Sequence, residues 1–335
     1  MDITNIIKQC LEENPCEADI RCGEPMKDHT TFKVGGPADY WISPDGEGFS
    51  GLCVSLLNHC RDEKIPLFIL GGGANIVVSD KGIRGIVLDM NKWRGESVWK
   101  LCAGEDELIL KSGTEIDEAA DSACADGLSG LEFLAGMPGT IGGALWMNAR
   151  CYEKEVSDVL SWAEVICSEE CTGVRSEEGG VRSDELKRDY VIKRFEFKDK
   201  KGFGYKKSPF QDMDCLILSA AFKLEKGDKE KMLLDMENKR QDRQDKGHYL
   251  FPCAGSVFKN NRDFGKPAGQ IIDELGLKGL KKGGAQVAPF HGNIIINNAN
   301  ATASDIRALV NEVKERVKKQ AGFNLEPEIL FVGEW

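Results

Sequence analysis

"GLSGLEFLAGMPGTIGGALWMNA", residues 127 to 149, contains six glycines and one proline among apolar residues. Such a density is unusual within one helix or one strand, because glycine and proline both weaken regular elements. The stretch therefore predicts a loop that wraps closely around another group. Two interpretations fit it: a tightly packed turn between domains, or a phosphate or ring system held by backbone amides.

A second glycine run lies upstream, in "IPLFILGGGANIVVSD" at residues 65 to 80. An apolar strand leads into three glycines, and "NIVVSD" predicts another strand after them. Consecutive glycines let backbone N–H groups approach an anion, although a flexible turn between strands is the alternative. The run is no dinucleotide fingerprint, since no Gly-x-Gly-x-x-Gly leads into a helix. Two such segments in one chain favour anion binding.

The surrounding sequence alternates between strand and helix patterns. Residues 168–189 are charged and nearly free of apolar side chains, which predicts an exposed hairpin or loop. The predicted helices cover 2–13, 47–62, 116–126 and 229–247, and the predicted strands lie within 31–42 (two, joined by a Gly-Gly-Pro turn), 65–80, 85–90, 107–116 and 216–225.

The last helix is specified in most detail. Thr302 and Asp305 stand at the N-cap and N3 positions of a capping box, and Gly322 follows the basic end of the pattern. One apolar stripe at helical spacing indicates a structural helix, formed by Ile306, Leu309, Val310, Val313 and Val317. Upstream, the lysines of "GLKGLKKGG" (276–284) flank glycines, which suits either an oxyanion-binding turn or a solvated charge run.

Composition excludes several classes of protein. At ~150 residues per domain, the 335 residues predict two or three domains, and 41% hydrophobic content suffices for their cores. A net charge of −11 argues against general nucleic-acid binding, which requires massed lysine and arginine. The acidic start resembles no signal peptide, and no apolar run approaches the ~20 residues that span a bilayer. We therefore expect a cytoplasmic protein without a membrane partner.

The cysteines and histidines point away from disulfides and metals. The twelve cysteines include no CxxC pair, so reduced and mostly buried thiols are expected. The four histidines are not spaced as helical metal ligands, and no metal site is predicted.

"PCAGSVFKN" (252–260) places Ser256 after a glycine and beside a short apolar pair. A nucleophilic serine needs a neighbouring base, but no histidine–carboxylate pair in a recognisable triad motif accompanies this one. Cys253 is expected to be a packing residue.

Taken together, eight motifs resemble the UDP-N-acetylenolpyruvoylglucosamine reductase family, flavoenzymes of bacterial peptidoglycan precursor synthesis. The resemblance runs in order from about residue 20 to 333, and the compact linker before "PCAGSVFKN" resembles the family's shorter form, which lacks an extra substrate-covering subdomain. The motifs are "HTTFKVGGPAD", "LGGGANIVVSD", "GLSGLEFLAGMPGTIGGA", "FGYKKSPF", "PCAGSVFKN", "GLKG…GGAQVAPFHGN", "NATASD" and "LEPEI".

The resemblance implies an α+β fold: a two-subdomain FAD-binding module of the vanillyl-alcohol-oxidase type, then an α/β substrate-binding domain. We expect the FAD-binding subdomains at 1–80 and 81–226, the substrate domain at 227–322, and a C-terminal strand with a catalytic glutamate at 323–335. It also implies FAD, NADPH as hydride donor, UDP-N-acetylglucosamine enolpyruvate as substrate, and a monomer. The implied FAD-binding residues are Gly71, Gly72, Gly73, Asn75, Pro138, Gly139, Thr140, Gly142, Gly143 and Asn148.

By the same resemblance, Ser256 is the proton donor to the substrate carbon C2 after a hydride has reached C3. Glu328, the second glutamate of "LEPE", polarises the substrate carboxylate by donating a hydrogen bond in its protonated form. Lys206 occupies the place of a third catalytic residue. The implied substrate-binding residues are Tyr205, Lys259, Asn260 and Lys278.

The chain departs from the family at two places. Tyr205-Lys206-Lys207-Ser208 stands where the family has Tyr-Arg-x-Ser, and an ammonium cannot make the two fixed hydrogen bonds of a guanidinium. In "MNARCYEKE" (147–155), Arg150 and Glu153 replace small residues. One hypothesis is that Arg150 supplies the missing guanidinium.

Two alternatives to an active reductase are a flavin- or nucleotide-sugar-binding paralogue with weak or no turnover, and a flavin oxidase with another substrate.

Overall fold

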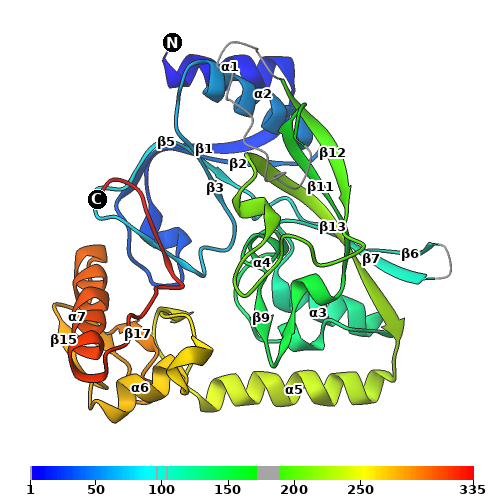
Figure 1. Ribbon diagram of the computed structural model, residues 1–335. Helices are drawn as coiled ribbons and strands as arrows, with labels where there is room; N and C mark the ends of the chain where they lie inside the picture. The colour runs from blue at the N-terminus through cyan, green and yellow to red at the C-terminus, as the bar shows by residue number, and fades with distance from the viewer. Residues whose placement is uncertain (1, 96, 103–104, 172–188) are drawn as a thin grey trace. The chain divides into compact units, whose positions relative to one another are not determined.

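The computed structural model describes residues 2–95, 97–102, 105–171 and 189–335 (Figure 1). Two compact units emerge from the chain's internal contacts. The first unit comprises residues 1–20, 42–71 and 88–239, and the second comprises 21–41, 72–87 and 240–335. The helices are α1 Ile3–Glu13, α2 Phe49–Asp62, α3 Ile116–Ala125, α4 Ile141–Trp146, α5 Lys229–Asp245, α6 Ala268–Glu274 and α7 Ala303–Ala321.

The main sheet of the first unit is antiparallel. Its strands are ordered β12-β11-β13-β7-β6, and the short β8 (Leu128–Ser129) pairs with the end of β13. Buried side chains from the sheet pack against α3 and α4, among them Leu108, Leu110 and Phe222. The strand bounds are β6 Val98–Cys102, β7 Glu105–Lys111, β11 Leu160–Ser168, β12 Tyr190–Glu196 and β13 Cys215–Lys226.

The second unit contains an antiparallel sheet in the order β14-β17-β16-β15, with α7 packed against it (Figure 1). A parallel pair joins β4 (Ile76–Val78) to β18 (Leu330–Val332), with Phe331 opposite Val77. The predicted apolar stripe of α7 is buried in this unit's core. The sheet strands are β14 Cys253–Ser256, β15 Lys281–Lys282, β16 Ala285–Val287 and β17 Ile294–Asn297.

The remaining strands form a four-stranded sheet in the order β1-β2-β5-β3 and a small hairpin, β9 with β10. This mixture of helices and largely antiparallel sheets confirms the α+β class. Their bounds are β1 Glu17–Pro25, β2 Pro37–Asp45, β3 Leu67–Leu70, β5 Ile83–Asp89, β9 Arg150–Cys151 and β10 Lys154–Glu155.

Most predicted elements are confirmed, including the capping box of α7 and the left-handed Gly322 that ends it. The strand expected at 31–34, before the Gly-Gly-Pro turn, is wrong. The N–H of Lys33 donates to the carbonyl of Thr30 at 3.1 Å and Lys33 has a φ of 56°, so the chain turns there. The continuous loop expected at 127–149 is interrupted by β8 and α4. The hairpin or loop expected at 168–189 falls largely outside the described residues.

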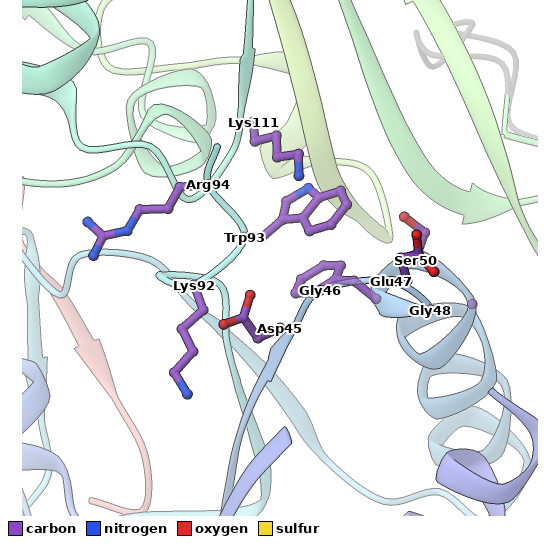
Figure 2. Close-up of a pocket in the computed structure, with 11 residues that line it drawn as sticks. Asp45, Gly46, Glu47, Gly48, Ser50, Lys92, Trp93, Arg94 and Lys111 are labelled. Atoms are coloured by element: carbon purple, nitrogen blue, oxygen red, sulfur yellow. The ribbon is translucent and has the colours of Figure 1, made fainter. Parts of the chain in front are cut away.

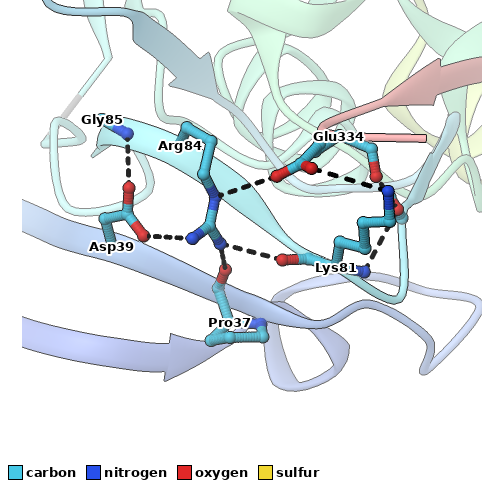
Figure 3. A network of polar contacts seen from close by, with 7 residues as sticks. Pro37, Asp39, Lys81, Arg84, Gly85 and Glu334 are labelled. Carbon is cyan, nitrogen blue, oxygen red and sulfur yellow. Dashed lines mark hydrogen bonds and ion pairs between the residues drawn. The ribbon is translucent and has the colours of Figure 1, made fainter.

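The end of the second unit is held by a polar network around Arg84 (Figure 3). The guanidinium lies 2.7 Å from the carboxylate of Asp39 and donates to the carbonyls of Pro37 at 3.2 Å and Lys81 at 2.8 Å. The carboxylate of Glu334 lies 3.9 Å from Arg84 and 3.5 Å from the ammonium of Lys81. These contacts join the segment that follows β18 to Lys81 and Arg84.

A distant carboxylate also caps α7. Asp80 accepts hydrogen bonds from the backbone N–H groups of Ala303 at 2.8 Å and Ser304 at 2.9 Å. We expect Asp80→Ala to lower the free energy of unfolding by about 1–2 kcal/mol, because helix N–H groups lose their acceptor. Asp80→Asn keeps one acceptor oxygen and should lose less. Urea denaturation checks both, and an unchanged Asp80→Ala midpoint would contradict the capping role.

Eleven of the twelve cysteines are identified as free thiols, as expected. Five are buried and five are partly buried, so the expectation that most are buried was too strong. Burial raises the pKa of Cys60, Cys167 and Cys215 to about 12, which keeps these thiols protonated at neutral pH. Among the described residues, no helix is both long and apolar enough to cross a membrane.

Candidate active site

Two segments far apart in the sequence meet around Ser256 in the second unit. The N–H of Glu328 donates to the carbonyl of Val257 at 2.7 Å, and the N–H of Lys259 donates to the carbonyl of Glu326 at 2.9 Å. An antiparallel bridge between Phe258 and Pro327 lies between these bonds. The structure therefore brings the predicted proton donor and the predicted catalytic glutamate onto neighbouring stretches of backbone.

Ser256 is the last residue of β14 and is partly buried. Asn293 fixes the chain directly after it: its backbone carbonyl accepts from Val257 N–H at 2.8 Å, and its side chain exchanges two hydrogen bonds with Phe258. Within the described chain, the hydroxyl of Ser256 has no hydrogen-bond partner. It is therefore available to a ligand. Sequence reasoning missed Asn293, although it ends the motif segment "FHGN".

Glu328 is only 8% exposed. Its carbonyl accepts from the side-chain amide of Asn75 at 3.1 Å, and the N–H of Leu330 donates to the carbonyl of Asn75 at 2.9 Å. Asn75 follows the first glycine run and is a predicted FAD-binding residue. A predicted cofactor-binding segment and the predicted catalytic glutamate are therefore joined by direct hydrogen bonds.

Two histidines lie together in the same unit, with ring centroids 6.1 Å apart. Burial, followed by the nearby Arg243, lowers the pKa of His248 to about 4. Burial also lowers the pKa of His291. Both imidazoles are therefore neutral at neutral pH, and neither provides an imidazolium acid.

The two glycine-rich segments meet in the first unit. A Cβ on Gly71 would lie 2.6 Å from the hydroxyl oxygen of Thr140, and one on Gly142 would lie 3.0 Å from the Cβ of Ser112. The N–H of Gly142 already donates to the carbonyl of Ser112 at 2.8 Å. Gly142 therefore permits close packing, but its N–H is not available to an anion. Fewer of the predicted backbone donors remain for anion binding.

The hydroxyls of Ser112 and Thr114, beside these glycines, indicate whether polar atoms of a cofactor would fit at this place. They are 2% and 3% exposed, and neither hydroxyl has a hydrogen-bond partner among the described residues. A buried, unsatisfied polar group costs about 1–3 kcal/mol, so a bound molecule with polar atoms would relieve that cost. Sequence reasoning missed both residues; two hydroxyls flanking a glycine after a buried strand were the available signal.

The other predicted FAD-binding residues differ in their exposure and in the hydrogen bonds that they make within the protein. Pro138 is exposed, whereas Thr140 is buried and caps α4 by accepting from the N–H of Gly143. Asn148 is fully buried; its amide donates to the carbonyl of Gly204 at 2.9 Å and its oxygen accepts from Ser157 N–H at 3.0 Å. Asn148 therefore holds two loops together. Gly139 lies beside Thr140 in the first unit, whereas Gly72 and Gly73 belong to the second unit.

The predicted substrate-binding residues are divided between the units. Tyr205 and Lys206 belong to the first unit, where Tyr205 is 40% exposed and Lys206 has a φ of 56°. Lys259, Asn260 and Lys278 belong to the second. Lys259 pairs with Glu326 at 2.5 Å, Lys278 pairs with Asp273 at 2.9 Å, and the side-chain oxygen of Asn260 accepts from Ala268 N–H at 2.9 Å.

A separate pocket of about 510 Å³ opens at the start of α2 in the first unit (Figure 2). Phe49 and Trp93 stack at 4.1 Å, and the ammonium of Lys111 lies 3.9 Å from the Trp93 ring centroid. The lining also carries both acidic and basic side chains, and none of the predicted site residues contributes to it. Because both signs of charge line the pocket, its chemistry does not indicate one class of ligand.

Two protein-family models match the chain. The model of an FAD binding domain matches residues 53–172, and the model of the UDP-N-acetylenolpyruvoylglucosamine reductase C-terminal domain matches residues 245–332. The first match includes Gly71, Ser112 and the second glycine-rich segment, and the second includes Ser256, Asn293 and Glu328.

Whole-chain comparisons agree with these matches. The chain is 38% identical to the UDP-N-acetylenolpyruvoylglucosamine reductase of Treponema denticola over 95% of both chains. It is 37% identical to that of Caldanaerobacter subterraneus subsp. tengcongensis, over 99% of this chain and 100% of the relative. The crystal structure of the reductase from Thermus caldophilus superposes with a TM-score of 0.69 at 28% identity, covering 95% of this chain and all of that one. The expected fold type is confirmed.

Proposed function

Because the chain belongs to the UDP-N-acetylenolpyruvoylglucosamine reductase family, we propose that it reduces UDP-N-acetylglucosamine enolpyruvate to UDP-N-acetylmuramate. It is an FAD-dependent oxidoreductase that uses NADPH, and its product is a precursor of peptidoglycan. The observation that carries the proposal is the identity to relatives of the same name over nearly the whole chain. The joined segments of Ser256 and Glu328 add independent support.

The chemistry of the residues beside the glycine-rich segments supports FAD binding. When bound, FAD supplies hydride-transfer chemistry, which no protein side chain provides. We assign its binding to the predicted glycine segments and Asn75, and we add the hydroxyls of Ser112 and Thr114 as polar contacts. Gly71 and Gly142 keep the backbone free of side-chain bulk, because a Cβ on either would meet a neighbouring side chain. Asn148 orients the loop that follows the second glycine-rich segment.

Ser256 donates the proton that completes the reduction at substrate carbon C2, and its hydroxyl regains a proton from water. Its hydroxyl is not committed to any described protein group, and Asn293 fixes the backbone beside it. A general acid has to lie within hydrogen-bond reach of the carbon it protonates, so a fixed position favours the reaction. The neutral His248 and His291 do not compete for this role.

Glu328 and Lys206 act on the substrate carboxylate in this proposal. Glu328 is largely shielded from water, so a hydrogen bond that it donates to a carboxylate is less screened there than at an exposed position. Lys206 contributes a positive charge against the electron density that develops next to that carboxylate. Tyr205, Lys259, Asn260 and Lys278 bind other parts of the sugar nucleotide. Lys259 and Lys278 would exchange their present carboxylate partners for substrate anions.

One experiment tests the function. The purified protein should show a flavin absorption spectrum and should oxidise NADPH only when the enolpyruvyl sugar nucleotide is present. Reoxidation by oxygen without that substrate would instead support a flavin oxidase. A bound flavin that NADPH and substrate together do not turn over would support a binding paralogue.

We further propose that the enzyme works as a monomer in the cytoplasm, where thiols stay reduced.

A further inference from the structure

Arg150 lies beside the loop that carries Lys206, in the first unit. It begins β9 and pairs with Glu155 of β10 across a tight hairpin. The guanidinium carbon is 5.9 Å from the centroid of the Tyr205 ring, and Tyr205 directly precedes Lys206. Arg150 is partly buried, so its guanidinium is partly removed from water.

Hydrogen bonds keep the two loops together without using Arg150. Asn148 donates to the carbonyl of Gly204 at 2.9 Å, and Ser208 donates to the carbonyl of Trp146 at 2.7 Å. Gln211 donates to the carbonyls of Trp146 at 2.8 Å and Lys206 at 3.1 Å. The position of the Arg150 backbone beside Lys206 is therefore set by the fold, and its guanidinium takes no part in these bonds.

The guanidinium of Arg150 has no ion pair or hydrogen bond with any described residue. The nearby carboxylate of Asp158 attracts Arg150 electrostatically but bonds directly to Lys200, and Glu155 accepts from Ser157 at 2.9 Å. The N–H donors of the guanidinium are therefore left without a bonded partner among the described residues, and a carboxylate can satisfy two of them at once. Packing on Tyr205 holds the group in place and satisfies none of its N–H donors.

We infer that Arg150 binds the carboxylate of the enolpyruvyl group and supplies the guanidinium that position 206 lacks, an inference that rests on the proposed function. A guanidinium can make two parallel hydrogen bonds to a carboxylate, whereas the ammonium of Lys206 acts as a point charge. The two side chains therefore have complementary roles, in which Arg150 fixes the plane of the carboxylate and Lys206 adds positive charge.

The test compares Arg150→Ala, Arg150→Lys, Lys206→Arg and the double variant Arg150→Ala/Lys206→Arg. In Arg150→Ala we expect kcat/KM for the enolpyruvyl substrate to fall about 10- to 100-fold, the range of one lost charged contact. FAD content and the rate of flavin reduction by NADPH should not change. Arg150→Lys should recover only part of the loss. Lys206→Arg should help Arg150→Ala far more than it helps the wild type.

Equilibrium titration of the oxidised protein separates this inference from the proposed function. Arg150→Ala should weaken binding of UDP-N-acetylglucosamine enolpyruvate but leave binding of UDP-N-acetylglucosamine, which has no carboxylate, unchanged. Equal weakening of both ligands, unchanged binding of both, or no additional gain from Lys206→Arg would overturn the inference. A wild type that binds the enolpyruvyl ligand without turning it over would contradict the proposed function, while this titration still decides the role of Arg150. A wild type that binds neither ligand would overturn both.

Discussion

Ser256→Ala is expected to leave flavin reduction by NADPH intact and to slow the reaction with the enolpyruvyl substrate by about 10²- to 10⁴-fold, the usual range for losing a general acid. The hydroxyl has no hydrogen-bond partner in the described part of the protein, so its removal breaks no internal contact. The change should therefore affect chemistry and leave folding unaltered. Stopped-flow absorbance of the flavin resolves the two half-reactions and measures each rate separately.

Ser304→Ala is a matched control for this prediction. Like Ser256→Ala, it removes one serine hydroxyl from the second unit. The hydroxyl of Ser304, however, donates to Asp80 at the start of α7. We expect it to lower stability slightly and to leave both half-reactions at wild-type rates. Normal turnover in Ser256→Ala would show that Ser256 is an ordinary loop hydroxyl, and slowed flavin reduction would place its role in the first half-reaction.

Glu328→Ala should slow the second half-reaction by about 10²- to 10³-fold, the range for losing one electrostatic contact to the transition state. Glu328→Gln should lose less, because an amide still donates a hydrogen bond to a carboxylate. The backbone of Glu328 is held through Val257 and Asn75, so neither substitution removes the bonds that place the segment. Single-turnover rates of the reduced enzyme with substrate measure both effects.

Glu326 provides the comparison within the same motif. Its side chain is 70% exposed and pairs with Lys259, an interaction of about 0–1 kcal/mol when it lies at a surface. Glu326→Gln should therefore change the rate by no more than about fivefold. A larger loss in Glu326→Gln than in Glu328→Gln would reverse the assignment of the catalytic glutamate.

Local sequence signals predicted local structure well. The N-cap at Thr302, the partner at Asp305, the apolar stripe and Gly322 lie within one helix, and each appears where the pattern placed it. The strand expected at 31–34 shows the limit of such signals. Alternating side chains there favoured an extended chain, whereas bonds to Gly73 and within the turn at Thr30 and Lys33 set its actual course.

The candidate site was only partly predictable. The motif resemblance identified Ser256 and Glu328 individually. The backbone hydrogen bonds that join their segments form only when residues 257 and 328 meet in three dimensions. Asn293, Ser112 and Thr114 had no signal of comparable strength. Their importance comes from burial and from the presence or absence of hydrogen-bond partners, which are properties of the packed protein.

The amino-acid order alone indicates the helices with their caps, the two glycine-rich segments, the family resemblance and the lysine at position 206. Three features become visible only in the folded chain: Asp80 caps α7 from more than two hundred residues away, Asn148 is committed to two loops, and Arg150 lies against Tyr205. The physical reason is the range of the interactions. Caps and periodic stripes act within a few turns of chain, whereas these contacts exist only after distant segments have packed together.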